Sequence, residues 1–523
     1  MELTATQLRS LSDKNMAEVV EDDILIGKDI LELLAGAMYT DPLSIYREYM
    51  QNAADSVDDA RQVGLMHGNN DSDVSIEFDH VGRTVLIRDF GFGIPSSQFA
   101  KRLTSVGGSR KRGKGQRGFR GIGRLSGLGY CQELVFRSRA AGQAEVLEMC
   151  WNGRVLRDRL RDTEFNGELG DLIREVVTIT RLSGAGFPEH FFDVELRKVL
   201  RIKNDVLMNE EAVRTYLSQV APVPFHPDFQ YGQEIQAWLS ERGVKAPVQI
   251  EINDGRGLVY HRVINTICFA PNVTDEFDGV EFLEYRNSDD ELLAFGWILE
   301  HDYLGAVPRR SGLSGIRLRS GDIQVGDELI LASLFPENRF ASWCVGDLHV
   351  VHPRILPNGR RDEFEPSPQY AQLQEEVRIL SRDITKIIRA RSDQRNKVRR
   401  LHLQLIYADT WLNVAGKESL PKIIRVLSVE RASNFAKLAA TEYEKLAPFH
   451  NEMDAVGDLI GRTQYQAAFL KQKLTSMDGF SSPHKEGKDS IIKAAICAIL
   501  NSAYKPDAVI PLAESVLSAM LSH

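Results

Sequence analysis

The segment YREYMQNAADSVDDA, residues 46–60, combines acidic and amide side chains at helical spacing. Read as a helix, it places Glu48, Asn52 and Asp55 on one face, because they are four and three residues apart. Small or apolar neighbours flank this face, which predicts that it is at least partly buried. Buried polar groups without partners cost free energy, so the pattern favours a face that receives a polar ligand.

A second motif, RDFGFGIP, places Asp89 at the end of an apolar segment and directly before Gly91 and Gly93. A carboxylate at the end of a strand is well placed to accept a hydrogen bond from an exocyclic amine. The glycines allow the backbone to turn and to approach a ligand closely. This motif therefore predicts one wall of a binding site.

A third motif, GFRGIGRLSG, contains Gly118, Gly121 and Gly123 before a predicted helix. Glycines at this spacing leave backbone N–H groups free to face phosphates. The glycine-rich, basic residues 101–117 lie between the second and third motifs and predict a lid over a polyphosphate. Each motif alone is weak, since plain turns and solvated charges give similar patterns, but their order along the chain makes chance a poor explanation.

The elements around these motifs predict an α/β sandwich that ends near residue 185. A helix is expected after Asp41-Pro42, and residues 189–217 are predicted to be helical. Apolar alternation predicts strands at 74–79 and 84–91, and further strands are expected at 133–139, 144–151 and 176–184.

A change of pattern predicts a second α+β region and then a helical one. Strands are expected at 248–254, 257–263, 292–300 and 315–327. Beyond Pro366 and Pro368 the chain is charge-rich and helical, with a polar break at 476–490 and an amphipathic segment at 491–504. Its apolar stripes fit either an internal core or a dimer interface, with core favoured. Residues 1–40 are also predicted to be helical.

Composition narrows the function classes. The 523 residues carry a net charge of -9, which argues against bulk attraction to nucleic acid or acidic membranes. Five scattered cysteines without a C-x-x-C pair argue against a zinc site or a disulfide framework and fit a cytoplasmic protein. No signal peptide is recognised, and no apolar run approaches the roughly 18 residues of a membrane span.

With these motifs in view, the chain resembles the GHKL ATPase superfamily, and within it the heat shock protein 90-like (HtpG-type) chaperones. Residues 46–60 are closest to the chaperone form of the first motif, and GFRGIGRLS aligns with the chaperone glycine loop without a gap. The resemblance implies a Bergerat-type α/β sandwich ATPase domain at 1–215. It further implies a ribosomal-S5-like middle domain at 216–368, followed by the helical region 369–523.

The resemblance also implies roles for the motif residues, with ATP and Mg²⁺ as ligands. Glu48 would be the general base for the attacking water, and Asn52 would coordinate Mg²⁺. Asp55 would more readily support this face by hydrogen bonding than bind directly. Asp89 would bind the adenine amino group, beside Gly91 and Gly93, and the three glycines at 118, 121 and 123 would cap the triphosphate.

Two further contacts follow from the same resemblance. Family members use a threonine near the adenine, for which Thr178 and Thr180 are both candidates, because the usual preceding glycine is missing. The loop HPRILPNGRRDEFE, 352–365, resembles a middle-domain loop that supplies an arginine to the γ-phosphate. Aligning on Asn358 places Arg361 at the arginine position and Arg360 where the family has a serine. A solvated surface pair is the alternative reading of these arginines.

The favoured function is an ATP-driven clamp of the chaperone type, expected to act as a homodimer on a protein client or with an effector protein. The alternative is a nucleic-acid-associated GHKL ATPase of DNA repair or phage defence. Nine Lys/Arg within 101–124 and the basic segment 386–400 support this alternative. A nucleotide-binding module without hydrolysis is the least favoured reading, because Glu48 and Asn52 are both present.

Overall fold

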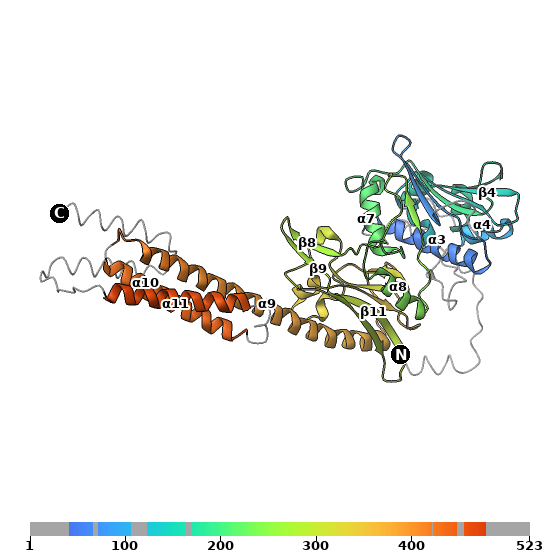
Figure 1. The fold of residues 1–523 in the computed structure, drawn as a ribbon. Helices are drawn as coiled ribbons and strands as arrows, with labels where there is room; N and C mark the ends of the chain where they lie inside the picture. The colour runs from blue at the N-terminus through green and yellow to red at the C-terminus, as the bar shows by residue number, and fades with distance from the viewer. Residues whose placement is uncertain are drawn as a thin grey trace, which may run out of the picture. The chain divides into compact units, whose positions relative to one another are not determined.

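The computed structural model describes residues 41–65, 72–105, 123–162, 169–420, 422–446 and 454–476. It divides into two compact units, Met1–Arg382 and Asp383–His523, and each is described by itself (Figure 1). The helices expected within residues 1–40 and the amphipathic segment 491–504 lie outside the described residues. No described helix is both long enough and apolar enough to cross a membrane.

Seven strands form the first sheet of unit 1, in the spatial order β5-β4-β3-β6-β2-β1-β7. The strands are β1 (Val74–Asp79), β2 (Thr84–Asp89), β3 (Glu133–Arg139), β4 (Glu145–Asn152), β5 (Val177–Ser183), β6 (Phe191–Arg197) and β7 (Ile250–Ile252). Neighbouring strands pair antiparallel, except β1 and β7, which are parallel. The five strands expected before residue 185 are confirmed, with ends that differ by at most two residues.

Helix α3 (Ser44–Gln62) shares its core with this sheet, because its apolar residues recur at helical spacing. Ile45, Tyr49 and Ala53 belong to the same buried cluster as Ile87 and Phe136. The helix begins where the sequence predicts, and the Asp41 carboxylate accepts a hydrogen bond from the Leu43 N–H at 3.1 Å. The other helical segments of this part are α4 (Ser96–Thr104), η1 (Gly123–Gly129), α5 (Gly153–Arg161), α6 (Leu169–Val176), η2 (Val206–Met208) and α7 (Glu210–Val220).

The prediction of helix for residues 189–217 is wrong over its first part. Residues Phe191–Arg197 form β6, inserted between β2 and β3, and only α7 is an α-helix in this region. Val194 and Leu196 alternate toward the core and pair with Phe136 and Leu134 on β3. A short apolar pattern of this kind fits either a strand, in which side chains alternate every two residues, or an amphipathic helix. Pairing with the neighbouring strands decides that this segment is a strand.

The first sheet also extends beyond the expected domain end at 215. Strand β7 pairs with β1, and the first core includes Val220, Ile250 and Val259. After α7 the chain forms α8 (Gly232–Glu241) and then returns to the first sheet, where β7 adds an edge strand beside β1.

A second, five-stranded sheet follows in the order β10-β11-β14-β12-β13. Its strands are β10 (Gly279–Arg286), β11 (Leu292–Glu300), β12 (Gly315–Ser320), β13 (Ile323–Val325) and β14 (Val345–Val350), and β8 (Thr266–Ala270) pairs separately with β9 (Val273–Glu276). Short 3-10 helices are η3 (Arg309–Ser311), η4 (Ala332–Leu334) and η5 (Asn338–Trp343). The expected strand at 257–263 is not formed; its only bridge joins Leu258 to Glu251. His261 and Arg262 are instead buried in a loop.

Helix α9 (Pro368–Gly416) begins in unit 1 and continues into unit 2. In unit 2 it is followed by α10 (Lys422–Glu444) and α11 (Asp454–Ser476). Small and apolar residues of these helices form the buried clusters of unit 2, such as Trp411 with Ala432 and Ala467. The described part of the C-terminal region is thus helical, as the sequence predicts.

Candidate functional site

The polar face of α3 lies inward, as its spacing predicts. Glu48 is 7% exposed and Asp55 is 2% exposed, while Asn52 is half-buried on the same face. The same helix is anchored at Tyr49, whose hydroxyl oxygen accepts a hydrogen bond from the Gly127 N–H at 2.9 Å. The structure therefore brings the three residues of the first motif together on a well-packed helix.

Glu48 lies among cations and against a glycine. Its Oε1 is 3.2 Å from Arg361 Nε and 3.7 Å from Arg47 Nε. Among the described residues, Oε1 has no partner with hydrogen-bond geometry, so the pairing is electrostatic rather than directional. A Cβ built on Gly123 would lie 2.2 Å from Glu48 Oε2. Only glycine at position 123 leaves room for this carboxylate.

Arg361 reaches Glu48 from a loop that follows the second sheet. Its φ is +57°, a left-handed conformation that is uncommon for residues other than glycine. The loop is closed by an antiparallel bridge between Pro357 and Phe364, and the Arg361 N–H donates to the Asn358 carbonyl at 3.2 Å. Glu48 and Arg361 lie far apart in the sequence, and the fold of unit 1 brings them together.

Arg47 holds this loop onto α3. Its Nη2 donates to the Arg360 carbonyl at 3.0 Å and its Nη1 donates to the Arg361 carbonyl at 3.4 Å. The guanidinium is buried beside Glu48, so one side chain contacts both the carboxylate and the loop backbone. Sequence reasoning missed Arg47, although a cation directly before Glu48 in a half-buried helix was a usable signal.

Asp89 lies buried at the end of β2, where the second motif predicts it. Its Oδ1 accepts a hydrogen bond from the Gly91 N–H at 3.0 Å. A Cβ on Gly91 would lie 2.5 Å from the backbone carbon of Ser56 on α3, so glycine is required for this approach. The Phe92 N–H donates to the Ser56 carbonyl at 3.1 Å and joins the motif to the helix that carries Glu48.

The second glycine of this motif has a different role. Gly93 has a φ of +69°, and a Cβ there would lie 2.2 Å from the Arg139 carbonyl oxygen. Beside it, the Ile94 N–H donates to Ser138 Oγ at 2.7 Å, and that hydroxyl donates to the Phe191 carbonyl at 3.1 Å. Ser138 thus ties the motif to β3 and β6, a contact that the sequence did not predict.

The third motif is described only from Gly123 onward. Gly118, Gly121 and most of the expected lid lie outside the described residues. At the boundaries of this segment, Arg124 donates to the Ser105 carbonyl, which holds the two described ends together. Burial lowers the pKa of the Arg124 guanidinium to about 10, so it remains charged at neutral pH.

The structure does not bring Thr178 to this site. Thr178 is exposed on β5, the edge strand, and β4, β3 and β6 separate it from β2, which carries Asp89. Thr180, the other candidate, is exposed on the same strand. Phe192 on β6 pairs with Asp89 instead. Strand β6, which lies beside β2 and was not recognised from the sequence, contains no threonine.

The described residues contain no group of three or more His, Cys, Asp or Glu side chains that could chelate a metal ion. A cation at this site would therefore depend on the Asn52 amide oxygen together with oxygens of a bound ligand. Mg²⁺ commonly binds through few protein ligands and the phosphates of its substrate, so the donor set fits such an ion.

No family model matches the chain. It is 26% identical over 154 residues to the chaperone protein HtpG of Orientia tsutsugamushi (strain Boryong), a match that covers 26% of this chain and 24% of the relative. It is 28% identical over 137 residues to the chaperone protein HtpG of Coxiella burnetii (strain RSA 331 / Henzerling II), covering 22% and 21%. The corresponding protein of Bordetella parapertussis is 26% identical over 141 residues, covering 24% and 22%. The matches span about a quarter of the relatives' length and indicate a distant relationship to HtpG chaperones.

Proposed function

We propose that this chain is a magnesium-dependent ATPase of the heat shock protein 90 type. The observation that carries the proposal is the buried Glu48 carboxylate, which meets Arg361 of a second-sheet loop at 3.2 Å. A buried acid beside a buried arginine is a costly arrangement unless the groups serve a purpose beyond stability. Hydrolysis of a phosphoanhydride needs both a group that orients water and a cation for the phosphate.

Glu48 is suited to orient the attacking water. Its Oε1 lies close to cations but makes no directed hydrogen bond among the described residues, so it retains lone pairs for a water molecule. Gly123 confines the other oxygen. The carboxylate would accept a hydrogen bond from the water and take its proton as the water oxygen bonds to the γ-phosphorus and the bond to the leaving ADP oxygen breaks.

Arg361 is suited to stabilise charge on the transferred phosphoryl group. A guanidinium is a cation whose N–H groups donate in a fixed fork that matches phosphate oxygens. The phosphate and the Glu48 carboxylate would compete for the Arg361 guanidinium, so ligand binding would weaken the contact between Arg361 and Glu48. Asn52 would hold Mg²⁺, which neutralises charge on the phosphates when bound.

Asp89 is suited to recognise the adenine. One carboxylate oxygen is already engaged by the Gly91 N–H, which fixes the orientation of the group. The remaining oxygen would accept from the exocyclic amine. Gly91 and Gly93 supply close backbone approaches on either side of this turn. The glycines at 118, 121 and 123 would face the phosphates. We assign no adenine contact to Thr178.

We further propose that the protein is a chaperone-like clamp, which acts as a homodimer on a protein client in the cytoplasm. Two observations support it: the distant relatives are chaperone proteins, and Arg361 reaches the site from a loop after the second sheet. ATP would favour one arrangement of these parts and hydrolysis would release it. ATP-dependent suppression of the aggregation of an unfolded protein tests this step; suppression that is indifferent to ATP would contradict it.

A nucleic-acid-associated ATPase is the second candidate, because α9 carries seven Lys/Arg and two Asp between residues 383 and 400. No side chain between Ile388 and Leu401 is buried in the described structure, which leaves these cations accessible to a polyanion. Binding to duplex DNA or RNA that weakens steeply as salt rises would support this candidate. Binding undetectable even at 50 mM salt would exclude it.

The central test is calorimetric titration with ATP and Mg²⁺, combined with a phosphate-release assay. We expect saturable binding and slow turnover. Glu48→Gln keeps the shape against Gly123, so we expect retained binding and turnover reduced by about 10² to 10⁴, the usual contribution of a general base. Asp59→Asn, exposed on the same helix, is the matched control. Absence of binding heat in the unmodified protein would refute the proposal.

A further inference from the structure

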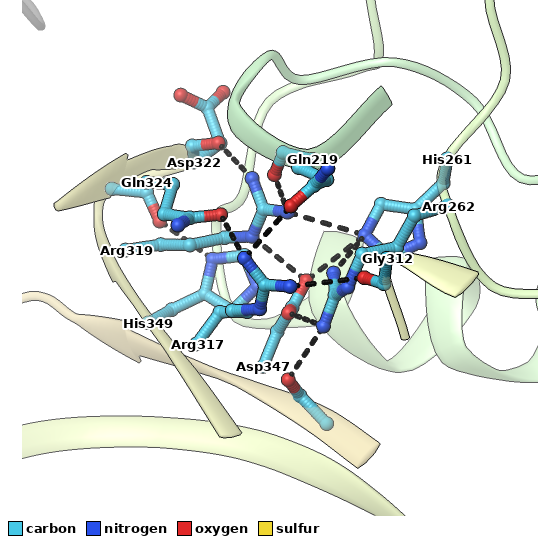
Figure 2. Close-up of polar contacts among 12 residues, drawn as sticks. Gln219, His261, Arg262, Gly312, Arg317, Arg319, Asp322, Gln324, Asp347 and His349 are labelled. Carbon is cyan, nitrogen blue, oxygen red and sulfur yellow. Dashed lines mark hydrogen bonds and ion pairs between the residues drawn. The ribbon is translucent and has the colours of Figure 1, made fainter. Parts of the chain in front are cut away.

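A buried group of polar side chains gathers beside β12 and β14 of the second sheet (Figure 2). We call it the arginine cluster; its members are Gln219, His261, Arg262, Arg317, Arg319, Gln324 and Asp347. Arg317 and Arg319 on β12 lie beside Asp347 and His349 on the parallel strand β14. Gln219 enters from the end of α7, which belongs to the first core.

The arginines of this cluster are not equally neutralised. Asp347 pairs with Arg319 at 2.7 Å and with Arg262 at 2.8 Å. Arg317, only 2% exposed, forms no ion pair with any described carboxylate. Its N–H groups donate instead to the Ser314 and Gly312 carbonyls. They also donate to Gln219 Oε1 at 3.0 Å and to Gln324 Oε1 at 3.5 Å.

Burying these arginines lowers the stability of the folded state. Burial lowers the pKa of Arg317 to about 9, and repulsion from Arg262 acts in the same direction. A well-packed apolar side chain would avoid that penalty, so stability alone gives a weak reason for an arginine here. A guanidinium does offer fixed donors in several directions, which lets it orient the groups that it contacts.

One of those groups leads to Arg361. Gln324 Nε2 donates to the Gly326 carbonyl at 3.0 Å, and the Gly326 N–H donates to the Arg361 carbonyl at 2.9 Å. Gly326 has a φ of +71°, and a Cβ there would lie 3.0 Å from the Asp362 carbonyl oxygen. The turn after β13 is therefore in direct contact with the backbone of residues 361–362.

The backbone of Arg361 needs such support. A non-glycine residue in the left-handed region is strained, and it keeps that conformation only when its surroundings determine it. Three contacts support it: its N–H donates to the Asn358 carbonyl, and its carbonyl accepts from the Gly326 N–H and from the Arg47 guanidinium. Gly326 approaches from the second sheet and Arg47 from α3, so the two fix the residue from opposite elements.

We propose that Arg317 and Gln324 are positioning residues for hydrolysis, acting through Gly326 to fix the backbone from which Arg361 reaches Glu48. The inference rests on the proposed ATPase function. Arg317 orients the Gln324 amide through its oxygen, the amide nitrogen holds the Gly326 turn, and the turn holds Arg361. Neither side chain contacts the substrate.

The test compares Gln324→Met with the unmodified protein in ATP binding and single-turnover hydrolysis. Methionine preserves volume and removes both amide contacts. We expect a kcat lower by about tenfold, as for a catalytic group shifted by part of an ångström, with ATP affinity unchanged. Gln324→Glu keeps an acceptor for Arg317 but cannot donate to Gly326, so it should lose activity as well. Ser381→Ala, which removes a buried 2.9 Å bond to the Leu334 carbonyl in the same unit, is the control and should leave kcat unchanged.

A double variant separates positioning from general damage to the fold. In an Arg361→Ala background, Gln324→Met should cause no further fall in kcat, because the residue that it positions is gone. Equal falls in both backgrounds, or normal kcat in folded Gln324→Met, would overturn the inference. If Arg361→Ala alone has normal kcat, the inference also fails, whereas the ATPase proposal fails only if the unmodified protein neither binds nor hydrolyses ATP.

Discussion

Replacing Gly123 by alanine tests whether the position of the Glu48 carboxylate matters for turnover. The added methyl would occupy space now filled by Glu48, since the three nearest atoms to that Cβ all belong to the Glu48 side chain. The end of a side chain moves more easily than backbone. We therefore expect Gly123→Ala to displace the carboxylate while the protein remains folded.

The size of the displacement follows from the structure. The Cβ would lie 2.2 Å from Glu48 Oε2, and ordinary contact begins near 3.4 Å, so the oxygen must withdraw by about 1.2 Å. A shift of about 1 Å in a catalytic group can cost about 10²-fold in rate. We expect kcat to fall by about 10²-fold, equivalent to about 2.7 kcal/mol of transition-state stabilisation.

The assay is steady-state phosphate release at saturating ATP, together with calorimetric ATP affinity and a circular-dichroism check of folding. Gly170→Ala is the matched control, because a Cβ at that helical position meets nothing within 4 Å. We expect the control to retain full turnover. A folded Gly123→Ala protein with turnover within threefold of the unmodified protein would refute the reasoning, because the methyl and the carboxylate cannot share the same space.

Three further predictions follow from the same structure. Asp89→Asn keeps the acceptor for the Gly91 N–H but loses a charged acceptor for an amine, so calorimetry should show ATP affinity lower by about 10- to 100-fold; unchanged affinity would place the base elsewhere. Arg361→Ala should lower kcat by about 10²-fold, as for a lost transition-state donor, and an unchanged rate would leave the loop without a catalytic role. Burial lowers the pKa of His261 to about 3 in the folded protein, whereas the unfolded chain keeps about 6.5. Between about pH 6.5 and about pH 3 only the unfolded state therefore binds a proton at this residue, and the folded state loses stability as pH falls through this range. At pH 5 this costs on the order of 2 kcal/mol; the difference in urea midpoint between pH 7.5 and pH 5 should be smaller in His261→Asn, and an equal difference in both proteins would contradict the lowered pKa.

Local patterns were enough to predict the elements that carry the first two motifs. Helical spacing predicted that Glu48, Asn52 and Asp55 share an inward face, and a strand followed by glycines predicted the turn after Asp89. These predictions depend on contacts within a few residues, which the sequence encodes directly. Strands β3, β4 and β5 were also predicted, because each is a short segment rich in apolar and β-branched or aromatic residues.

The order of strands was not encoded locally. Residues 191–197 have an apolar pattern that fits a strand or a short helix, and only insertion between β2 and β3 makes them a strand. The resemblance offered Thr178 and Thr180 as candidates near the adenine, but the structure puts both on an exposed edge strand. Pairing between distant segments is a property of the whole sheet, so no window of sequence could reveal it.

The sequence by itself determined which residues could perform chemistry, because residue type and short spacing fix the local face or turn on which each lies. The tertiary structure alone decided which of them meet. It placed Arg361 beside Glu48 and let Arg47 donate hydrogen bonds to the backbone of the same loop. It also connected this loop to the arginine cluster through Gly326. These contacts join α3, a turn of the second sheet and the loop that follows it, and such packing depends on all the residues that fill the shared space.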